Sequence, residues 1–212
     1  MTQKKGTYKQ SLAVEEQGRK VIIPFLTKIA YGGRFVWTDS DKFLQNNYGD
    51  ILVSIDSTET VAVEMKTEKE NKYGNLFLET WSNKRWNTPG WMDKLESCDI
   101  LLYNFLKSDE CFGVHFPSLV KWFNENKTKY KEKPQNKYVQ ANDTWGRPVP
   151  ISVLTTKAGV FNMPFTDPDE WVAAWYKLVE ISLEFREEKT VTSFNNIHNM
   201  SCTNIMDSKV KL

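Results

Sequence analysis

The sequence predicts an α/β protein in which a mixed central β-sheet is flanked by helices. Three patterns carry this prediction: a helical stretch at Tyr8–Ile23, two β-branched apolar runs at Ile51–Ile55 and Val61–Met65, and a helical stripe that follows Asp167. With 212 residues, one domain with a sizeable core is the simplest expectation. We expect it to span residues 1–188, with a polar C-terminal tail at 189–212.

Composition narrows the function classes. The net charge is +1, so the chain lacks the global basic field of many non-specific nucleic-acid binders, and any DNA contact must come from local patches. Three cysteines without a CxxC pair and two histidines do not complete a zinc spacing. No apolar stretch reaches the roughly 18 residues of a membrane span. These features indicate a soluble, cytoplasmic protein with no membrane partner.

The first helix presents a mixed inward face. With Ile22 at its centre, Glu15, Gly18 and Leu26 lie on the same side at 100° per residue. Pro24 should end or kink the helix. A glutamate on this face needs a partner, because an unpaired buried carboxylate is costly; the alternative is a solvated acid near the helix start.

After a turn, a short strand at 34–38 and a connector at 39–47 lead to a hairpin. In its second strand Val61, Val63 and Met65 take one face, which should be core, while Glu64 and Lys66 share the other. Asp50 opens the first strand behind Gly49.

Strand pairing would bring the Asp50 and Glu64 carboxylates close together. Such a pair repels unless a cation lies between them, and its hard oxygen ligands favour Mg²⁺ or Mn²⁺. Lys66 would then orient or activate a water. The tripeptide Glu-x-Lys also occurs at Glu70–Lys72 and Glu125–Lys127. The alternative is therefore an edge hairpin with a solvated outer face and a surface ion pair.

Gly49-Asp50, thirteen intervening residues and then Glu64-x-Lys66 resemble the PD-(D/E)XK nuclease signature. The resemblance is to the phage and Holliday-junction-resolvase-like branch of that superfamily, with Gly49 in place of the proline. It extends to 74–83 as the third strand and to 88–106 as the second helix and fourth strand, and more loosely to 149–154. It implies a restriction-endonuclease-like αβββαβ core with C-terminal helical additions.

The resemblance also implies a function, a Mg²⁺-dependent (or Mn²⁺-dependent) deoxyribonuclease, as an endonuclease. Asp50 and Glu64 would hold the metal, Lys66 would position or activate the water, and Glu15 would support the site from the first helix. DNA is the implied partner, a phage origin is suggested, and a homodimer would suit paired cuts on two strands.

Downstream residues supply candidates for substrate contact. Glu79 is a candidate for a second metal or for substrate, against an exposed or structural acid. Ser82 and Asn83 could bond phosphate or cap a turn. Lys84, Arg85, Trp86 and Trp91 could hold a backbone and stack a base, or the tryptophans could pack under a loop. Three lysines are candidates for phosphate contacts: Lys127, Lys129 and Lys131. The alternative is that they form a solvated face.

The final helix has the clearest start signal, with Asp167 as N-cap and Pro168 at its first position. Its apolar stripe should be core or a partner interface. The alternative function is a catalytically inactive nuclease-like module that binds nucleic acid or a protein. A nucleotide hydrolase or transferase is disfavoured by the absence of GxxxxGK[ST] and GxGxxG loops.

Overall fold

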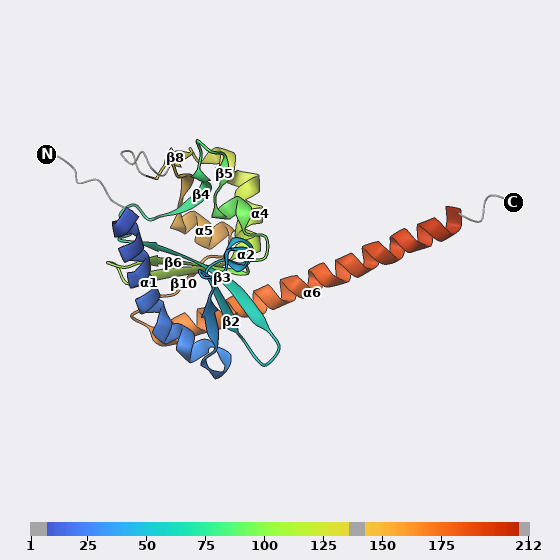
Figure 1. The fold of residues 1–212 in the computed structure, drawn as a ribbon, viewed down its shortest axis with the longest axis horizontal. Helices are drawn as coiled ribbons and strands as arrows, with labels where there is room; N and C mark the ends of the chain where they lie inside the picture. Colours follow the sequence, from blue (N-terminus) through green and yellow to red (C-terminus); the bar gives the residue numbers. More distant parts are fainter. Residues whose placement is uncertain (1–7, 136–142, 208–212) are drawn as a thin grey trace.

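The computed structural model describes the backbone of residues 8–135 and 143–207, and the side chains of 12–135 and 143–192. Six strands of this part form the central sheet in the order β1-β2-β3-β6-β7-β10 (Figure 1). Their bounds are β1 Phe35–Trp37, β2 Ile51–Ser54, β3 Thr60–Glu68, β6 Ile100–Phe105, β7 Glu110–His115 and β10 Phe161–Asn162. Since β3 and β6 are parallel and the other neighbours antiparallel, the predicted mixed central sheet is confirmed.

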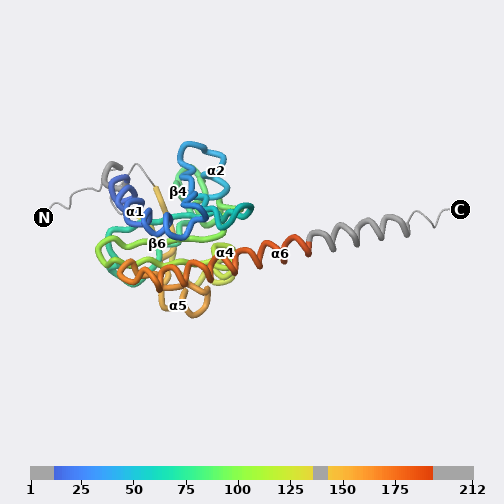
Figure 2. Tube along the Cα trace, turned by 90° about the horizontal axis from the view of Figure 1, so that it is seen from below, coloured from blue at the N-terminus to red at the C-terminus, as the bar shows by residue number. Residues whose placement is uncertain are grey.

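Two helices cover one face of this sheet, α1 (Tyr8–Ile29) and the first part of α6 (Pro168–Asp207) (Figure 2). Val61, Val63 and Met65 of β3 point into this layer, as their alternation predicted. From α6, the indoles of Trp171 and Trp175 stack at 6.0 Å and are fully buried.

Helix α1 continues past Pro24, so of the two outcomes expected at this proline, an end or a kink, the end is not observed. Pro24 is exposed, whereas Leu26 and Ile29 beyond it are buried. An interior proline costs about 3 kcal/mol, and burying two such side chains offsets it at about 1.5–3 kcal/mol each. The inward positions Gly18, Ile22 and Leu26 are buried as predicted.

A second sheet covers the opposite face of the central sheet, with the order β5-β4-β9-β8 among the described strands. Its bounds are β4 Asn75–Asn83, β5 Thr88–Pro89, β8 Lys133–Pro134 and β9 Trp145–Pro150. Helices α3 (Trp91–Lys94), α4 (Phe116–Asn126) and α5 (Ile151–Lys157) complete this layer. In Figure 1 the second sheet lies across the central sheet from the body-bound part of α6.

The second sheet corrects one strand assignment. The stretch 74–83 was expected to be the third strand of the core, but β4 pairs with β5 and β9, outside the central sheet. The charged link after β3 turns the chain away, with Gly74 at φ 63°. Leu76 and Leu78 then pack onto the central sheet with Leu101 in one buried cluster. The second sheet is thus a layer on that sheet.

Short helices fill the connections: α2 (Lys42–Tyr48), and the 3-10 turns η1 (Tyr31–Gly33) and η2 (Lys127–Lys129). Asp41 caps α2, its carboxylate accepting from the backbone N–H of Phe43 at 2.8 Å and of Leu44 at 3.1 Å. The loosely matching stretch 149–154 is divided between the end of β9 and the start of α5. No helix in the described part is long and apolar enough to cross a membrane.

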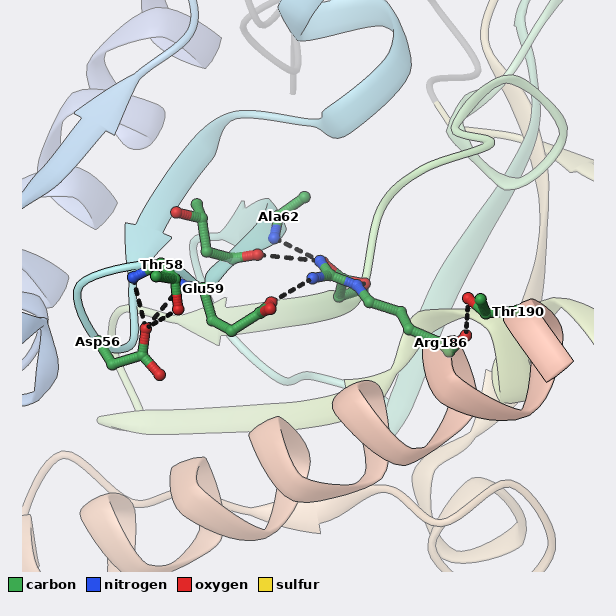
Figure 3. Close-up of polar contacts among 8 residues, drawn as sticks. Asp56, Thr58, Glu59, Ala62, Arg186 and Thr190 are labelled. Atoms are coloured by element: carbon green, nitrogen blue, oxygen red, sulfur yellow. Dashed lines mark hydrogen bonds and ion pairs between the residues drawn. The ribbon is translucent and has the colours of Figure 1, made fainter.

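Helix α6 starts where the capping pattern predicted, with Asp167 Oδ1 accepting from the Glu170 N–H at 3.0 Å. The expected polar tail begins inside this helix, which runs on to Asp207 and projects from the body (Figure 1); 208–212 lie outside the described residues. Arg186 anchors α6 where it leaves the body. Its guanidinium bonds Asp99 and the Thr60 carbonyl, and it reaches Glu59 (Figure 3).

Candidate functional site

The site begins where β2 meets β3. Ile51 pairs with Val63, so Asp50 lies opposite Glu64. The Asp50 N–H donates to the Val63 carbonyl at 2.9 Å, and the Asp50 carboxylate accepts from the Met65 N–H at 3.0 Å. The side chain of Asp50 thus continues the ladder where the backbone of the first strand has turned away, and this fixes its carboxylate beside β3.

Gly49 makes this entry feasible. It adopts φ 95°, and a Cβ there would lie 2.9 Å from the Val63 carbonyl oxygen and 3.0 Å from the Glu64 nitrogen. Thr38 holds the same segment, since its N–H donates to the Asp50 carbonyl at 3.0 Å and its hydroxyl to the Gly49 carbonyl. A residue with a side chain would push Asp50 off β3, which gives a physical reason for glycine where the resembled motif has proline.

Glu64 and Lys66 form an ion pair on the face that the alternation predicted. The Lys66 Nζ lies 2.5 Å from a Glu64 carboxylate oxygen, and the Glu64 side chain is only 6% exposed. Because β3 is bonded on both sides, to β2 and β6, the alternative of a solvated edge hairpin is wrong.

Burial dominates the electrostatics of this pair. It raises the pKa of Glu64 to about 7; the charge of Lys66 opposes this rise and the nearby Asp50 adds to it. Burial alone would lower the pKa of Lys66, but the carboxylates of Glu64, Asp50 and Glu79 outweigh it and the pKa is raised. Three acids therefore act on one ammonium group.

Glu79 approaches this cluster from β4, in the second sheet. Burial raises its pKa, which the charge of Lys66 and a hydrogen bond from the Trp91 backbone counteract. The backbone at Gly90 lies very close to β4, because a Cβ at Gly90 would lie 2.5 Å from the Glu79 carbonyl oxygen. The Lys66 Nζ lies 5.7 Å from the centre of the Trp91 ring. The cluster is thus enclosed between the two sheets and α3.

Sequence reasoning missed Lys94. Its charge acts on both Glu64 and Glu79, lowering their pKa values, and its side chain is exposed at the rim of the cluster. It lies one helical turn after Trp91 on α3, a spacing that places the two on one side. The shared turn with Trp91 is the signal that could have found it.

Glu15 is not brought to this cluster. Its side chain is 46% exposed and accepts from Arg19 at 3.1 Å, and Arg19 also bonds Asp39 at 3.2 Å. Helix α1 covers the other face of the central sheet, where Gly18 packs on Thr67. Its partner on the helix is therefore Arg19, and its support of a metal site stays a prediction.

The candidates for substrate contact divide by exposure. Asn83 is buried, and its side-chain amide oxygen Oδ1 accepts from the Trp86 N–H at 3.2 Å. The Ser82 hydroxyl donates to the Thr88 carbonyl at 3.4 Å, so both side chains organise the turn. Lys84 pairs with Glu132. Trp86 is 72% exposed, as stacking on a base would require, whereas Trp91 is 4% exposed, as packing under a loop would require.

The lysine-rich segment lies at the end of α4. Lys127 donates to the Asn124 side chain at 2.9 Å and Lys129 to that of Asn126 at 2.6 Å. Lys131 is exposed. Both bonds are to neutral side chains, and the contact of these lysines with phosphates stays a prediction.

Asp50 and Glu64 supply only oxygen ligands, which is the donor set that Mg²⁺ and Mn²⁺ prefer. Among the described residues no group of three or more His, Cys, Asp or Glu side chains is placed to hold a metal. Water and substrate would have to supply the other ligands, and Glu64 would have to contact both the metal and the Lys66 ammonium.

Neither any family model nor any curated protein matches the chain.

Proposed function

We propose that the protein is a metal-dependent nuclease that hydrolyses DNA phosphodiester bonds. One observation carries the proposal: Asp50, Glu64 and Lys66 converge on one face of paired strands, with Glu64 buried and bonded to Lys66. Buried charged clusters with no packing role are typical of functional sites, because each buried charge costs free energy that folding alone does not recover.

The order of elements supports the family assignment. Helix α1, strands β1, β2 and β3, helix α3 and strand β6 follow one another as αβββαβ once α2, β4 and β5 are treated as insertions. In this reading the three-residue strand β1 is the first core strand. Asp50 then lies directly before the second strand and Glu64-x-Lys66 on the third, and these two strands are neighbours in the sheet.

Each residue has a role in this proposal. Asp50 and Glu64 would hold Mg²⁺, which when bound stabilises negative charge on phosphate oxygens and makes a bound water more acidic. Lys66 would donate hydrogen bonds from its ammonium to the attacking water or to the phosphate, held in place by Glu64. Glu79 would limit the room left beside Lys66.

Cleavage of supercoiled plasmid and of labelled linear and branched DNA tests the proposal. The wild type should cut with Mg²⁺ or Mn²⁺ and not with EDTA, and Lys66→Ala and Glu64→Ala should bind DNA but not cut it. Lys72→Ala, in the exposed Glu70-x-Lys72 copy, is the matched control and should cut normally. If folded wild-type protein cuts none of these substrates with either metal, the inactive binding module becomes the better proposal.

A further inference from the structure

A large aromatic side chain stands in solvent at the tip of the β4–β5 hairpin. Trp86 is 72% exposed, whereas Trp91, Trp171 and Trp175 are at most 4% exposed. An indole is among the largest apolar groups that folding can bury, and leaving one in water forfeits that gain. An exposed indole on an ordered turn is therefore available for contact with another molecule.

The turn that carries Trp86 is fixed at several points. The buried Asn83 side chain accepts from the Trp86 N–H at 3.2 Å, and the Asn87 N–H donates to the Lys84 carbonyl at 3.2 Å. Asn87 adopts φ 52°, a conformation that asparagine tolerates well. The backbone of the turn is thus fixed, so mainly the side-chain rotamer of Trp86 would have to be ordered for the indole to stack on a ligand.

Lys84 ties this turn to the rest of the second sheet. Its N–H donates to the Asp143 carbonyl at 2.8 Å, and its ammonium pairs with Glu132 and lies 4.2 Å from the centre of the Trp145 ring. The lysine is therefore committed to structure. Its role is to brace the tip.

The exposed charge at the tip is that of Arg85, because Lys84 is paired with Glu132. Residues 82–88 contain two cations and no acid, as the letters SNKRWNT show. Arg85 is exposed, and in the described part of the chain its side chain has no hydrogen bond or ion pair. An exposed planar ring and an exposed guanidinium on consecutive residues suit a nucleobase with its phosphate. The partner's chemistry is therefore that of nucleic acid.

The tip is continuous with the candidate site. Strand β4 carries Glu79 in its middle and ends at Asn83, and the turn that holds Trp86 follows. At about 3.3 Å per strand residue, the Cα atom of Trp86 lies within about 23 Å of that of Glu79. A strand of DNA that reaches the tip would extend only a few nucleotides beyond the cluster.

We propose that Trp86 stacks on an unpaired base of the substrate, and that the nuclease acts on DNA with a single-stranded part near the cut. In a continuous duplex each base face is covered by its neighbours, so an indole at a hairpin tip has no face to stack on. A branch, flap or overhang exposes one. This inference rests on the proposed function and names its substrate class.

Binding in EDTA separates stacking from cleavage. The probes are a duplex with a single-stranded overhang and a fully paired duplex of the same length, each with 2-aminopurine, whose fluorescence falls on stacking. The variants are Trp86→Ala, Trp86→Phe and the control Tyr73→Ala, which removes an aromatic side chain that is 76% exposed at the other end of β4.

Trp86→Ala should weaken binding to the overhang duplex about 5- to 100-fold, the range expected for one base–aromatic stack. It should abolish quenching of the unpaired 2-aminopurine and change binding to the paired duplex less than about twofold, since only the stack is lost. Trp86→Phe should retain most of the affinity, and Tyr73→Ala should match the wild type.

Equal losses on both duplexes, or unchanged quenching in Trp86→Ala, would overturn the inference. Unchanged DNA affinity in Trp86→Ala would also overturn it, and would point to a protein surface as the contact of the indole. A parallel assay in Mg²⁺ keeps the two proposals apart. Stacking that depends on Trp86, without cleavage, would reject only the proposal of nuclease activity. Cleavage of every substrate without dependence on Trp86 would reject only the proposal that Trp86 stacks on a base.

Discussion

The tripeptide Glu-x-Lys occurs in two neighbouring parts of the chain with different physics. In β3 the Glu64 side chain is 6% exposed and its pKa is raised by burial to about 7. In the link after β3 the Glu70 side chain is 47% exposed, and its pKa is lowered by a hydrogen bond from Lys107. The comparison teaches that burial between two sheets, and not the tripeptide itself, gives the first copy its shifted pKa.

The strongest way to break the comparison is to neutralise each glutamate in turn. Glu64→Gln should lower cleavage about 10²- to 10³-fold, the loss typical of one preorganised electrostatic group. Glu70→Gln should leave the rate within about twofold, because a solvent-exposed charge contributes little. Initial rates of plasmid nicking in Mg²⁺ measure both. Equal losses in the two variants would contradict the distinction.

Ion pairs of the scaffold sharpen the comparison for stability. Asp99 is buried and accepts from Arg186 at 3.0 Å and from the Ala62 N–H at 2.7 Å. Asp99→Ala should lower the free energy of unfolding by about 2–3 kcal/mol, less than for a fully buried pair because Arg186 is partly exposed. Urea denaturation monitored by circular dichroism measures this loss.

Lys107→Ala is the control for that measurement, because it breaks the exposed pair with Glu70. No change in the denaturation midpoint is expected, since solvent screens the pair. A loss as large as that of Asp99→Ala would show that exposure does not decide the value of these pairs.

A smaller stability effect is expected at the entry to the site. Gly49→Ala should cost about 2 kcal/mol, from the positive φ and from displacement of the β3 backbone. It should also lower cleavage, because Asp50 moves with the chain. Gly33→Ala shares the positive φ of 68° but meets no atom within 4 Å, so it should cost less and leave cleavage unchanged. Similar losses of stability and cleavage in both variants would argue against the close approach as the cause.

The smallest effect concerns acid. Because the folded pKa of Glu70 is lowered, its contribution to stability is present above the unfolded pKa and is lost as pH falls through the folded pKa. Glu70→Ala should therefore narrow the difference in Tm between about pH 7 and about pH 3 very slightly. A large change in the Tm difference would contradict the small electrostatic contribution expected of a side chain that is 47% exposed.

Local periodicity was enough to predict the hairpin and the faces of its residues. In β3 alternation separates Val61, Val63 and Met65 from Glu64 and Lys66, and both sets lie as expected. The capping signal at Asp167 likewise located the start of α6. At Pro24 the helix continues, and Leu26, which periodicity placed on the inward face, is buried beyond the proline.

The sequence by itself determined which residues could share a face, because that depends on the geometry of a single strand or helix. Only the tertiary structure decided which faces meet. The pairing of β4 with β9 joins residues about seventy positions apart. The packing of β4 on the central sheet brings the charge of Glu79 within range of Lys66. The fate of each tryptophan was settled in the same way, since burial depends on what the rest of the chain packs against it. Trp91 is enclosed under the second sheet while Trp86 stands in solvent.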